Sequence, residues 1–125
     1  MLRQGPIPPY VHGALEYIAA GLLIAAPFIF GFDSDAATAA SIVVGVAVLV
    51  ITASTESATG LTKVIPVAIH AVLDLVLAGF LIAAPFLFGF QDETAPTAFF
   101  IVLGVVHLLL TIGTRFLPGR AATPG

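Results

Sequence analysis

The feature that most constrains this chain is a set of four long stretches without a charged residue. They contain between 16 and 21 residues each and cover residues 17–32, 36–55, 75–91 and 94–114. A helix that crosses a bilayer needs about 20 mostly apolar residues, with a range of roughly 17–25. The second and fourth stretches have this length. The first and third reach it when each extends backward past one carboxylate, Glu16 or Asp74.

The stretches predict an all-α membrane protein whose four transmembrane helices cover about residues 9–31, 37–55, 66–89 and 96–115. Their apolar residues are continuous rather than alternating, which disfavours a membrane β-barrel. Composition agrees, because 59% of the 125 residues are hydrophobic and only 9% are charged. A soluble domain carries about 25% charged residues. We therefore expect one transmembrane domain over residues 1–125, in contact with the lipid bilayer.

Several function classes are excluded by what the sequence lacks. Only four basic residues are present, too few for a nucleic-acid binder. The absence of cysteine excludes disulfides, thiolate metal sites and cysteine nucleophiles. No phosphate-binding glycine loop or zinc-protease motif occurs, and the predicted loops are too short to build a catalytic site. We expect a protein that is not an enzyme. Arg3 before an apolar stretch is typical of a signal peptide, but that stretch contains His12 and Glu16 and has a second copy later in the chain.

That second copy is the strongest pattern in the sequence. Residues 12–32 and 70–90 are identical at 13 of 21 positions, at an offset of 58. The similarity predicts two internal repeats, at 7–55 and 65–114, each made of two helices. Since each unit contains an even number of helices, both copies should insert the same way up, as parallel repeats.

The charges outside the apolar stretches predict the orientation. All four basic residues fall on one side of the predicted bundle: Arg3, Lys63, Arg115 and Arg120. The acids of the opposite loops are Asp33, Asp35, Asp92 and Glu93, placed where they can cap the next helices. The positive-inside rule then puts both termini in the cytoplasm of a multi-pass protein. The tail at 117–125 is expected to be disordered.

A proline-aromatic motif ends the first helix of each repeat, at 26–32 and 84–90. Proline removes a helical hydrogen bond, and glycine permits the turn that follows. The motif predicts a helix kink with an aromatic anchor near the outer membrane interface. Its main residues are Pro27, Phe28, Gly31, Pro85, Phe86 and Gly89. A kink that opens a small binding cleft, as in transporters, is the alternative.

With this motif the chain resembles the SPW-repeat membrane proteins over nearly its whole length, from Ile7 to about Thr114. The shared features include an upstream histidine, the Gly-Phe pair after the motif and the length of the helix pair. The naming tripeptide differs, since Ala-Pro-Phe at 26–28 and 84–86 replaces Ser-Pro-Trp, and the chain has no tryptophan. The resemblance implies a four-helix protein of a bacterial or archaeal cytoplasmic membrane and implies no particular activity.

Five ionisable residues fall inside the predicted helices, at a similar depth in their cytoplasmic half: His12, Glu16, His70, Asp74 and His107. Such groups are expensive in a bilayer and face the bundle interior or water. Three hypotheses stay open. Each carboxylate pairs with its own histidine or with a neighbouring hydroxyl or amide to fix helix packing; the cluster carries protons or ions; or it binds a metal or haem. No cofactor is assigned from the sequence.

Small residues at four-residue spacing predict close helix contacts, within the bundle or in an oligomer. They are Gly21, Ala25, Gly79, Ala83, Ser41 and Gly45. Together the patterns favour a small non-enzymatic scaffold or accessory subunit, forming a homo-oligomer or part of a larger membrane complex. Proton- or ion-coupled transport is the first alternative, and a metal or haem carrier is the second.

Overall fold

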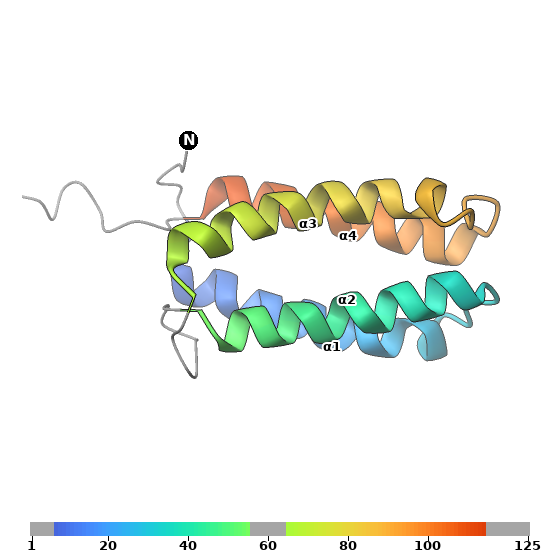
Figure 1. Ribbon diagram of the computed structural model, residues 1–125, viewed down its shortest axis with the longest axis horizontal. Coiled ribbons are helices and arrows are strands. Elements are labelled where there is room, and N and C mark those ends of the chain that lie inside the picture. Colours follow the sequence, from blue (N-terminus) through green and yellow to red (C-terminus); the bar gives the residue numbers. More distant parts are fainter. Residues whose placement is uncertain (1–6, 56–64, 115–125) are drawn as a thin grey trace, which may run out of the picture.

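Four helices, each antiparallel to the next along the chain, make up the described part, residues 7–55 and 65–114 of a computed structural model (Figure 1). They are α1 (Pro9–Ile29), α2 (Asp35–Ala53), α3 (Val67–Leu87) and α4 (Thr94–Gly113). Each is long and apolar enough to cross a membrane. The predicted all-α membrane fold with four spanning helices is confirmed for these residues.

All four helices end two residues before their predicted ends, and the cause is visible at α1 and α3. Gly31 and Gly89 take positive φ angles of 63° and 71°, a conformation that stops a helix. The amide of Phe32 then bonds back to the carbonyl of Pro27 at 3.0 Å, and the amide of Phe90 bonds to that of Pro85 at 2.9 Å. The motif therefore ends each helix with a glycine turn that satisfies a terminal carbonyl.

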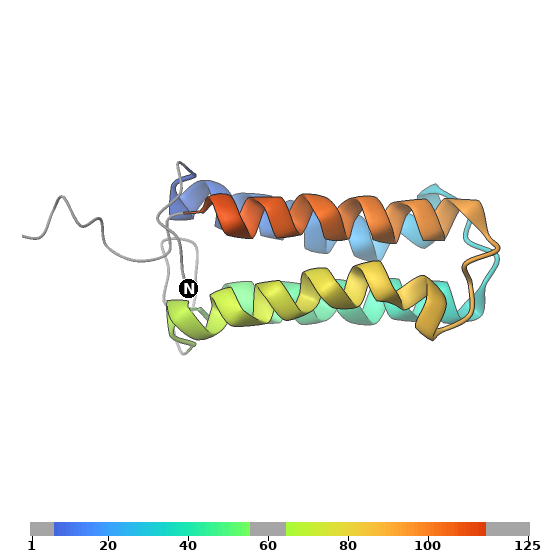
Figure 2. The same cartoon turned by 90° about the horizontal axis from the view of Figure 1, so that it is seen from above.

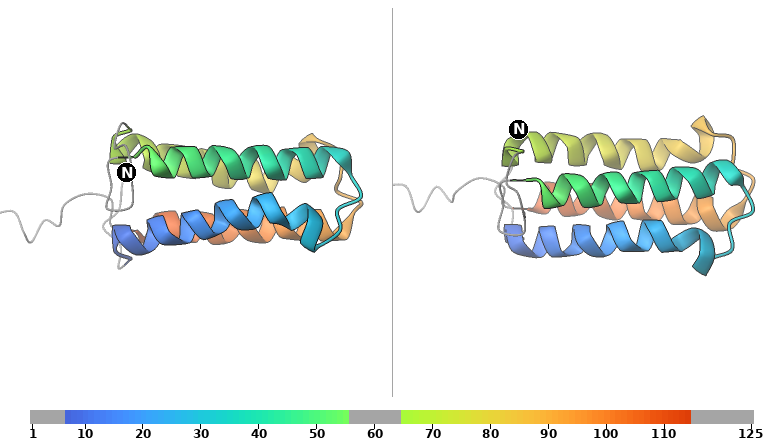
Figure 3. Two further views of the ribbon diagram at one scale, coloured as in Figure 1. Left: turned by 90° about the horizontal axis from the view of Figure 1, so that it is seen from below. Right: turned by 60° about the horizontal axis from the view of Figure 1, so that its bottom comes forward.

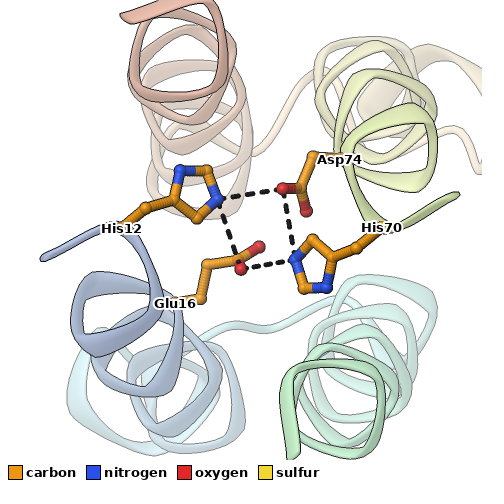
Figure 4. A group of neighbouring side chains, drawn as sticks. All are labelled: His12, Glu16, His70 and Asp74. Carbon is orange, nitrogen blue, oxygen red and sulfur yellow. Dashed lines mark hydrogen bonds and ion pairs between the residues drawn. The ribbon is translucent and has the colours of Figure 1, made fainter. Parts of the chain in front are cut away.

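The helices lie at the corners of a square when the views are compared (Figures 1, 2 and 3). α1 has α2 and α4 as neighbours, and α3 lies diagonally across from it (Figure 4). We call α1–α2 the first hairpin and α3–α4 the second hairpin. Packing is much closer within each hairpin than between the two. The bundle is thus two tight hairpins joined along two looser seams.

One glycine in each hairpin allows this close packing. A Cβ atom on Gly45 would lie 2.9 Å from the carbonyl oxygen of Ala20, and one on Gly104 would lie 3.0 Å from that of Ala78. The first distance is shorter than real Cβ contacts, and the second is tighter than nine in ten of them. These two glycines therefore set how near α2 approaches α1 and how near α4 approaches α3.

Gly21 and Gly79 do not take part in close packing within the bundle. Both are exposed, and nothing lies within 4 Å of a Cβ built on either. Ala25 and Ala83, four residues later, are half-buried. Close approach inside the bundle therefore occurs at Gly45 and Gly104, and contact at Gly21 and Gly79 stays a prediction for an oligomer only.

The apolar core fills the end of the bundle near the α1–α2 and α3–α4 loops. Its largest member, Phe100, is fully buried and packs edge-on against Phe90 with 5.2 Å between the ring centroids. The motif residues Phe28 and Phe86 point outward instead, with 74% and 61% of their surface exposed. Their outward position suits contact with lipid, and the anchor role stays a prediction.

Proline inside α1 leaves a carbonyl without its helical partner, and the neighbouring helix supplies one. Pro27 has no amide to bond the carbonyl of Leu23, four residues earlier. The hydroxyl of Ser41 on α2 donates to that oxygen at 2.5 Å. In the second hairpin the residue aligned with Ser41 is Phe100, which has no hydroxyl to offer Leu81.

The acidic loops cap their helices in an unexpected way. Ser34 caps α2, because its hydroxyl accepts from the amide of Ala37. Glu93 precedes α4 but makes no side-chain cap there. Its carboxylate instead accepts from the amides of Asp33 and Ser34, at 2.6 and 2.9 Å, and so links the two hairpins.

The predicted orientation and the predicted disorder of the tail depend on residues that the structure does not describe. All four basic residues and the tail at 117–125 lie outside the described residues. The orientation of the bundle in the membrane therefore rests on the sequence alone.

Candidate functional site

Five ionisable side chains gather on the bundle axis, at the end where α1 and α3 begin. They are His12 and Glu16 of α1, His70 and Asp74 of α3, and His107 of α4, and none is more than 5% exposed. Figure 4 shows the first four pointing toward one another from diagonally opposite helices. The structure thus brings together all five residues that the sequence singled out in the helices.

Helical spacing explains how two residues from each helix reach one point. Residues four apart lie on the same face of a helix, one turn above the other. α1 and α3 run in the same direction (Figure 1), and the crossed contacts between their histidines and carboxylates put the equivalent residues at the same level along the axis. Each helix therefore presents a histidine and a carboxylate to the same space.

The closest contacts cross from one hairpin to the other. His12 Nε2 lies 2.9 Å from Asp74 Oδ2, and His70 Nε2 lies 2.6 Å from Glu16 Oε1. The contacts between each histidine and the carboxylate of its own helix are longer, at 3.2 Å in both cases. The four contacts form a closed ring of His12, Asp74, His70 and Glu16. The hypothesis that each carboxylate pairs with its own histidine accounts only for the two longer contacts of this ring.

Threonines outside the ring hold the two histidines in place. His12 Nδ1 lies 2.7 Å from Thr114 Oγ1, and that hydroxyl donates to the carbonyl of Leu110 at 2.5 Å. His70 Nδ1 lies 2.6 Å from Thr55 Oγ1, which donates to the carbonyl of Ile51 at 2.5 Å. Because each hydroxyl proton is used on a carbonyl, each threonine oxygen accepts from Nδ1–H.

This arrangement fixes the orientation of both imidazoles. Nδ1 donates outward to a threonine, and Nε2 faces the carboxylates. Sequence reasoning assigned no site to Thr55 or Thr114. Their alignment with each other in the repeat, together with the alignment of His12 with His70, was the signal that could have connected them.

Short backbone bridges bring these threonines to the histidines. The amide of Ile7 bonds to the carbonyl of Gly113 at 2.9 Å, and the amide of Ile65 bonds to that of Ser54 at 2.6 Å. The first bridge ties the start of α1 to the end of α4. The second ties the segment before α3 to the end of α2. Each threonine therefore stands beside the first turns of a helix next to its own.

His107 stands apart from the ring. Its Nε2 lies 3.2 Å from Asp74 Oδ1 and 3.6 Å from Glu16 Oε2. Nε2 is thus in ion-pair range of both carboxylates, although it makes no hydrogen bond to the described residues. In the repeat its counterpart is Val48, on the opposite helix. Three imidazoles thus face two carboxylates, and one of the three lies outside the ring.

A small cavity of about 50 Å³ borders the carboxylates on the Val48 side. Glu16, Asp74 and Thr52 line it, and it lies along the seam between α2 and α3. Thr52 Oγ1 is buried there without a hydrogen-bond partner among the described residues. Most of its lining is apolar, and the two carboxylates and Thr52 form its polar edge, where the volume is large enough for a water molecule or an ion. A porphyrin would not fit, so this cavity gives no support to the haem alternative.

Comparison with known proteins identifies the family. No curated protein and no solved structure matches the chain. A family model, the SPW repeat domain, matches residues 10–114, a span that includes all four helices and the five ionisable residues. The Ala-Pro-Phe departure at 26–28 and 84–86 does not prevent that match, and the chain belongs to the SPW repeat family.

Proposed function

We propose that this chain is a small non-enzymatic membrane protein that acts as a scaffold or accessory subunit, bound to copies of itself or within a larger membrane complex. The observation that carries the proposal is the outward position of Gly21 and Gly79. Both are exposed with open space around them, although glycine is a poor helix former. Glycine on the outside of a membrane helix permits close approach of another helix.

The remaining surface of the described bundle suits such a role. Its most exposed large side chains in the middle of the helices are apolar, for example Ile18, Val43 and Val76, with 63–65% of their surface exposed. The loops at 30–34 and 88–93 are short, and Glu93 turns its carboxylate toward the neighbouring loop. A partner would therefore contact helix surfaces rather than a projecting domain.

The test is the size and composition of the protein purified in mild detergent. We expect a defined oligomer or a co-purifying membrane partner, identified by cross-linking and mass spectrometry. Gly21→Leu combined with Gly79→Leu should disrupt that assembly by blocking close approach. Ala39→Leu, at an exposed position of α2, is the matched control and should leave it intact. A stable wild-type monomer without companions would contradict the proposal.

A second candidate function is proton- or ion-coupled transport through the axial cluster. It is favoured by the cavity beside Glu16 and Asp74 and by the unpaired hydroxyl of Thr52 within it. Liposomes containing the protein should then show a flux that disappears in the double variant Glu16→Gln, Asp74→Asn. The variant Glu93→Gln, outside the cluster, should keep the flux. Wild-type liposomes without flux would remove this candidate.

A further inference from the structure

We propose that the axial cluster is a binding site for one divalent first-row transition metal ion, with His12, Glu16, His70 and Asp74 as four ligands and His107 as the fifth. The site is independent of the scaffold proposal, because it lies inside one chain and needs no second copy. Four observations carry it: the spacing of the donor atoms, the orientation of two histidines by threonine, the position of His107 outside the ring and the charge of the cluster.

The first observation is the spacing of the donors. One donor atom from each of His12, Glu16, His70 and Asp74 lies within 4.8 Å of all the others. Around the ring the N–O distances alternate between 2.6–2.9 Å and 3.2 Å. A metal bound at about 2.0–2.2 Å separates neighbouring ligand atoms by roughly 2.8–3.6 Å, depending on geometry. An ion at the centre therefore requires the two short contacts to widen by a few tenths of an ångström, and donor atoms as far as 4.8 Å apart to approach to about 4.4 Å or less.

The second observation is the outer support. Metal-binding histidines almost always donate their other ring N–H to an oxygen, which fixes the tautomer and the ring plane. Thr114 and Thr55 provide this support for His12 and His70, at 2.7 and 2.6 Å. Both Nε2 atoms are thereby turned toward the point where the carboxylates also converge, and a metal would take the place of their protons. The threonines themselves are held by helical carbonyls, so the arrangement exists before any ion arrives.

The third observation is His107, which the ring does not use. Its side chain is 4% exposed, and its Nε2 has no hydrogen-bond partner among the described residues. A buried polar atom without a hydrogen bond is costly. Nε2 instead lies in ion-pair range of the outer carboxylate oxygens, 3.2 Å from Asp74 Oδ1. Coordination to an ion between the carboxylates would give this atom a direct ligand bond in place of that contact.

The fourth observation is charge. Two carboxylates on the axis of a membrane bundle need two positive charges close by. Protonated His12 and His70 supply them when no metal is bound, and one divalent cation replaces both protons. Three imidazole nitrogens and carboxylate oxygens together favour ions such as Zn²⁺, Fe²⁺ or Mn²⁺ over Mg²⁺ and Ca²⁺, which prefer oxygen alone. The cavity along the α2–α3 seam borders both carboxylates and gives space for an ion or its water.

The experiment titrates Zn²⁺ into the full chain, stripped with a chelator and purified in detergent without a histidine tag. Calorimetry should show one Zn²⁺ per chain, with protons released on binding because the ligands bind the metal deprotonated. Co²⁺ should give the visible absorption of a low-symmetry nitrogen and oxygen site, and Zn²⁺ should displace it. Oligomeric size is measured on the same samples, so failure of the metal site and failure of the scaffold proposal are separate results.

Two variants and one control locate the site. His107→Val should weaken Zn²⁺ binding by about tenfold or more and change the Co²⁺ spectrum. Valine is chosen because Val48 occupies the equivalent position of the first hairpin, so the fold should tolerate it. The double variant Glu16→Gln, Asp74→Asn should abolish 1:1 binding. Asp92→Asn combined with Glu93→Gln, in the outer loop, should bind Zn²⁺ like wild type.

Three results would overturn the proposal. Wild-type protein with no saturable 1:1 binding would remove the site. Binding that survives Glu16→Gln, Asp74→Asn but is lost in the loop control would place the ion on surface acids. An unchanged affinity and spectrum in His107→Val would remove His107 from the ligand set. Circular dichroism of every variant checks that the helices are retained, and His107→Val remains informative if the carboxylate variant does not fold.

Discussion

The first hairpin and the second hairpin place identical or closely similar side chains at the points where they meet. Each supplies a histidine, a carboxylate and a threonine to the axial cluster, and each ends its leading helix with proline, phenylalanine and a glycine in positive φ. Each also packs through one glycine, Gly45 or Gly104. These shared features build the hairpin and connect it to its partner.

Two of the buried positions at which the hairpins differ change the surroundings of the cluster and of the core. Val48 in the first corresponds to His107 in the second, and Ser41 corresponds to Phe100. The first difference adds a third imidazole beside the carboxylates on one side and leaves a cavity on the other. The second replaces a hydroxyl that bonds a free carbonyl with a large aromatic core residue. The comparison teaches that the ring needs both hairpins equally, whereas the space around it is specialised on each side.

The largest effect should come from breaking the ring in either hairpin. His12→Ala and His70→Ala each leave a buried carboxylate without its closest partner, which costs about 3–5 kcal/mol of unfolding free energy. Denaturant unfolding in detergent micelles measures both. The values should agree within about 1 kcal/mol, because each histidine has the same crossed contact and the same threonine support. Clearly unequal losses would show that the hairpins are not equivalent at the ring.

The next effect concerns the glycine contacts. Gly45→Ala and Gly104→Ala should each destabilise the bundle by about 1–3 kcal/mol, because the new methyl group meets a backbone carbonyl that cannot move aside. Gly21→Ala and Gly79→Ala are the matched controls and should be neutral, or stabilising by up to about 1 kcal/mol through better helix propensity. The same unfolding assay applies. Equal losses at all four glycines would contradict the assignment of close packing to Gly45 and Gly104.

A smaller effect should come from the hydroxyl that bonds the free carbonyl before Pro27, which has no counterpart before Pro85. Ser41→Ala removes the donor to the Leu23 carbonyl and should cost about 1 kcal/mol. In the background of Pro27→Ala the same change should cost almost nothing, since the restored amide at position 27 can bond that carbonyl. A double-mutant cycle measures the coupling. Two additive effects would show that proline is not the reason for the serine.

The smallest effect lies in the outer loops. Glu93→Gln keeps one acceptor but loses the charge that strengthens its bonds to the amides of Asp33 and Ser34, so about 0.5 kcal/mol is expected. Hydrogen exchange at those two amides should become faster. Asp92→Asn, an exposed neighbour, is the control and should change neither amide. Unchanged exchange in Glu93→Gln would mean that the loops do not depend on this link.

The helices could be predicted from the sequence because membrane helices are determined by length and apolarity. The ends of the helices were harder to predict. The turns at Gly31 and Gly89 stop α1 and α3 two residues early, and the sequence shows the glycines but not the residue at which the helix stops. Close packing at Gly21 and Gly79 was expected from small-residue spacing. Spacing alone does not say which way a helix is rotated, and both glycines face outward.

The candidate site was predicted in part. Residue spacing placed His12 with Glu16 and His70 with Asp74 at one level of the bundle, and the structure brings them together there, whereas their depth in the membrane stays a prediction. It did not predict that the closest contacts cross between the hairpins, because that depends on which helices are diagonal in the bundle. The roles of Thr55 and Thr114 also depend on neighbouring helices and were missed.

The two lengths of histidine–carboxylate contact bear on how the chain is made. Synthesis proceeds from the amino end, so α1 enters the bilayer before α3 exists. During that interval Glu16 cannot reach His70, but His12 lies one turn away on its own helix, at 3.2 Å in the finished bundle. The local pair gives a newly inserted hairpin a temporary partner for its charge. Arrival of the second hairpin then adds two shorter crossed contacts to the local ones, so the ring closes only when both halves are present.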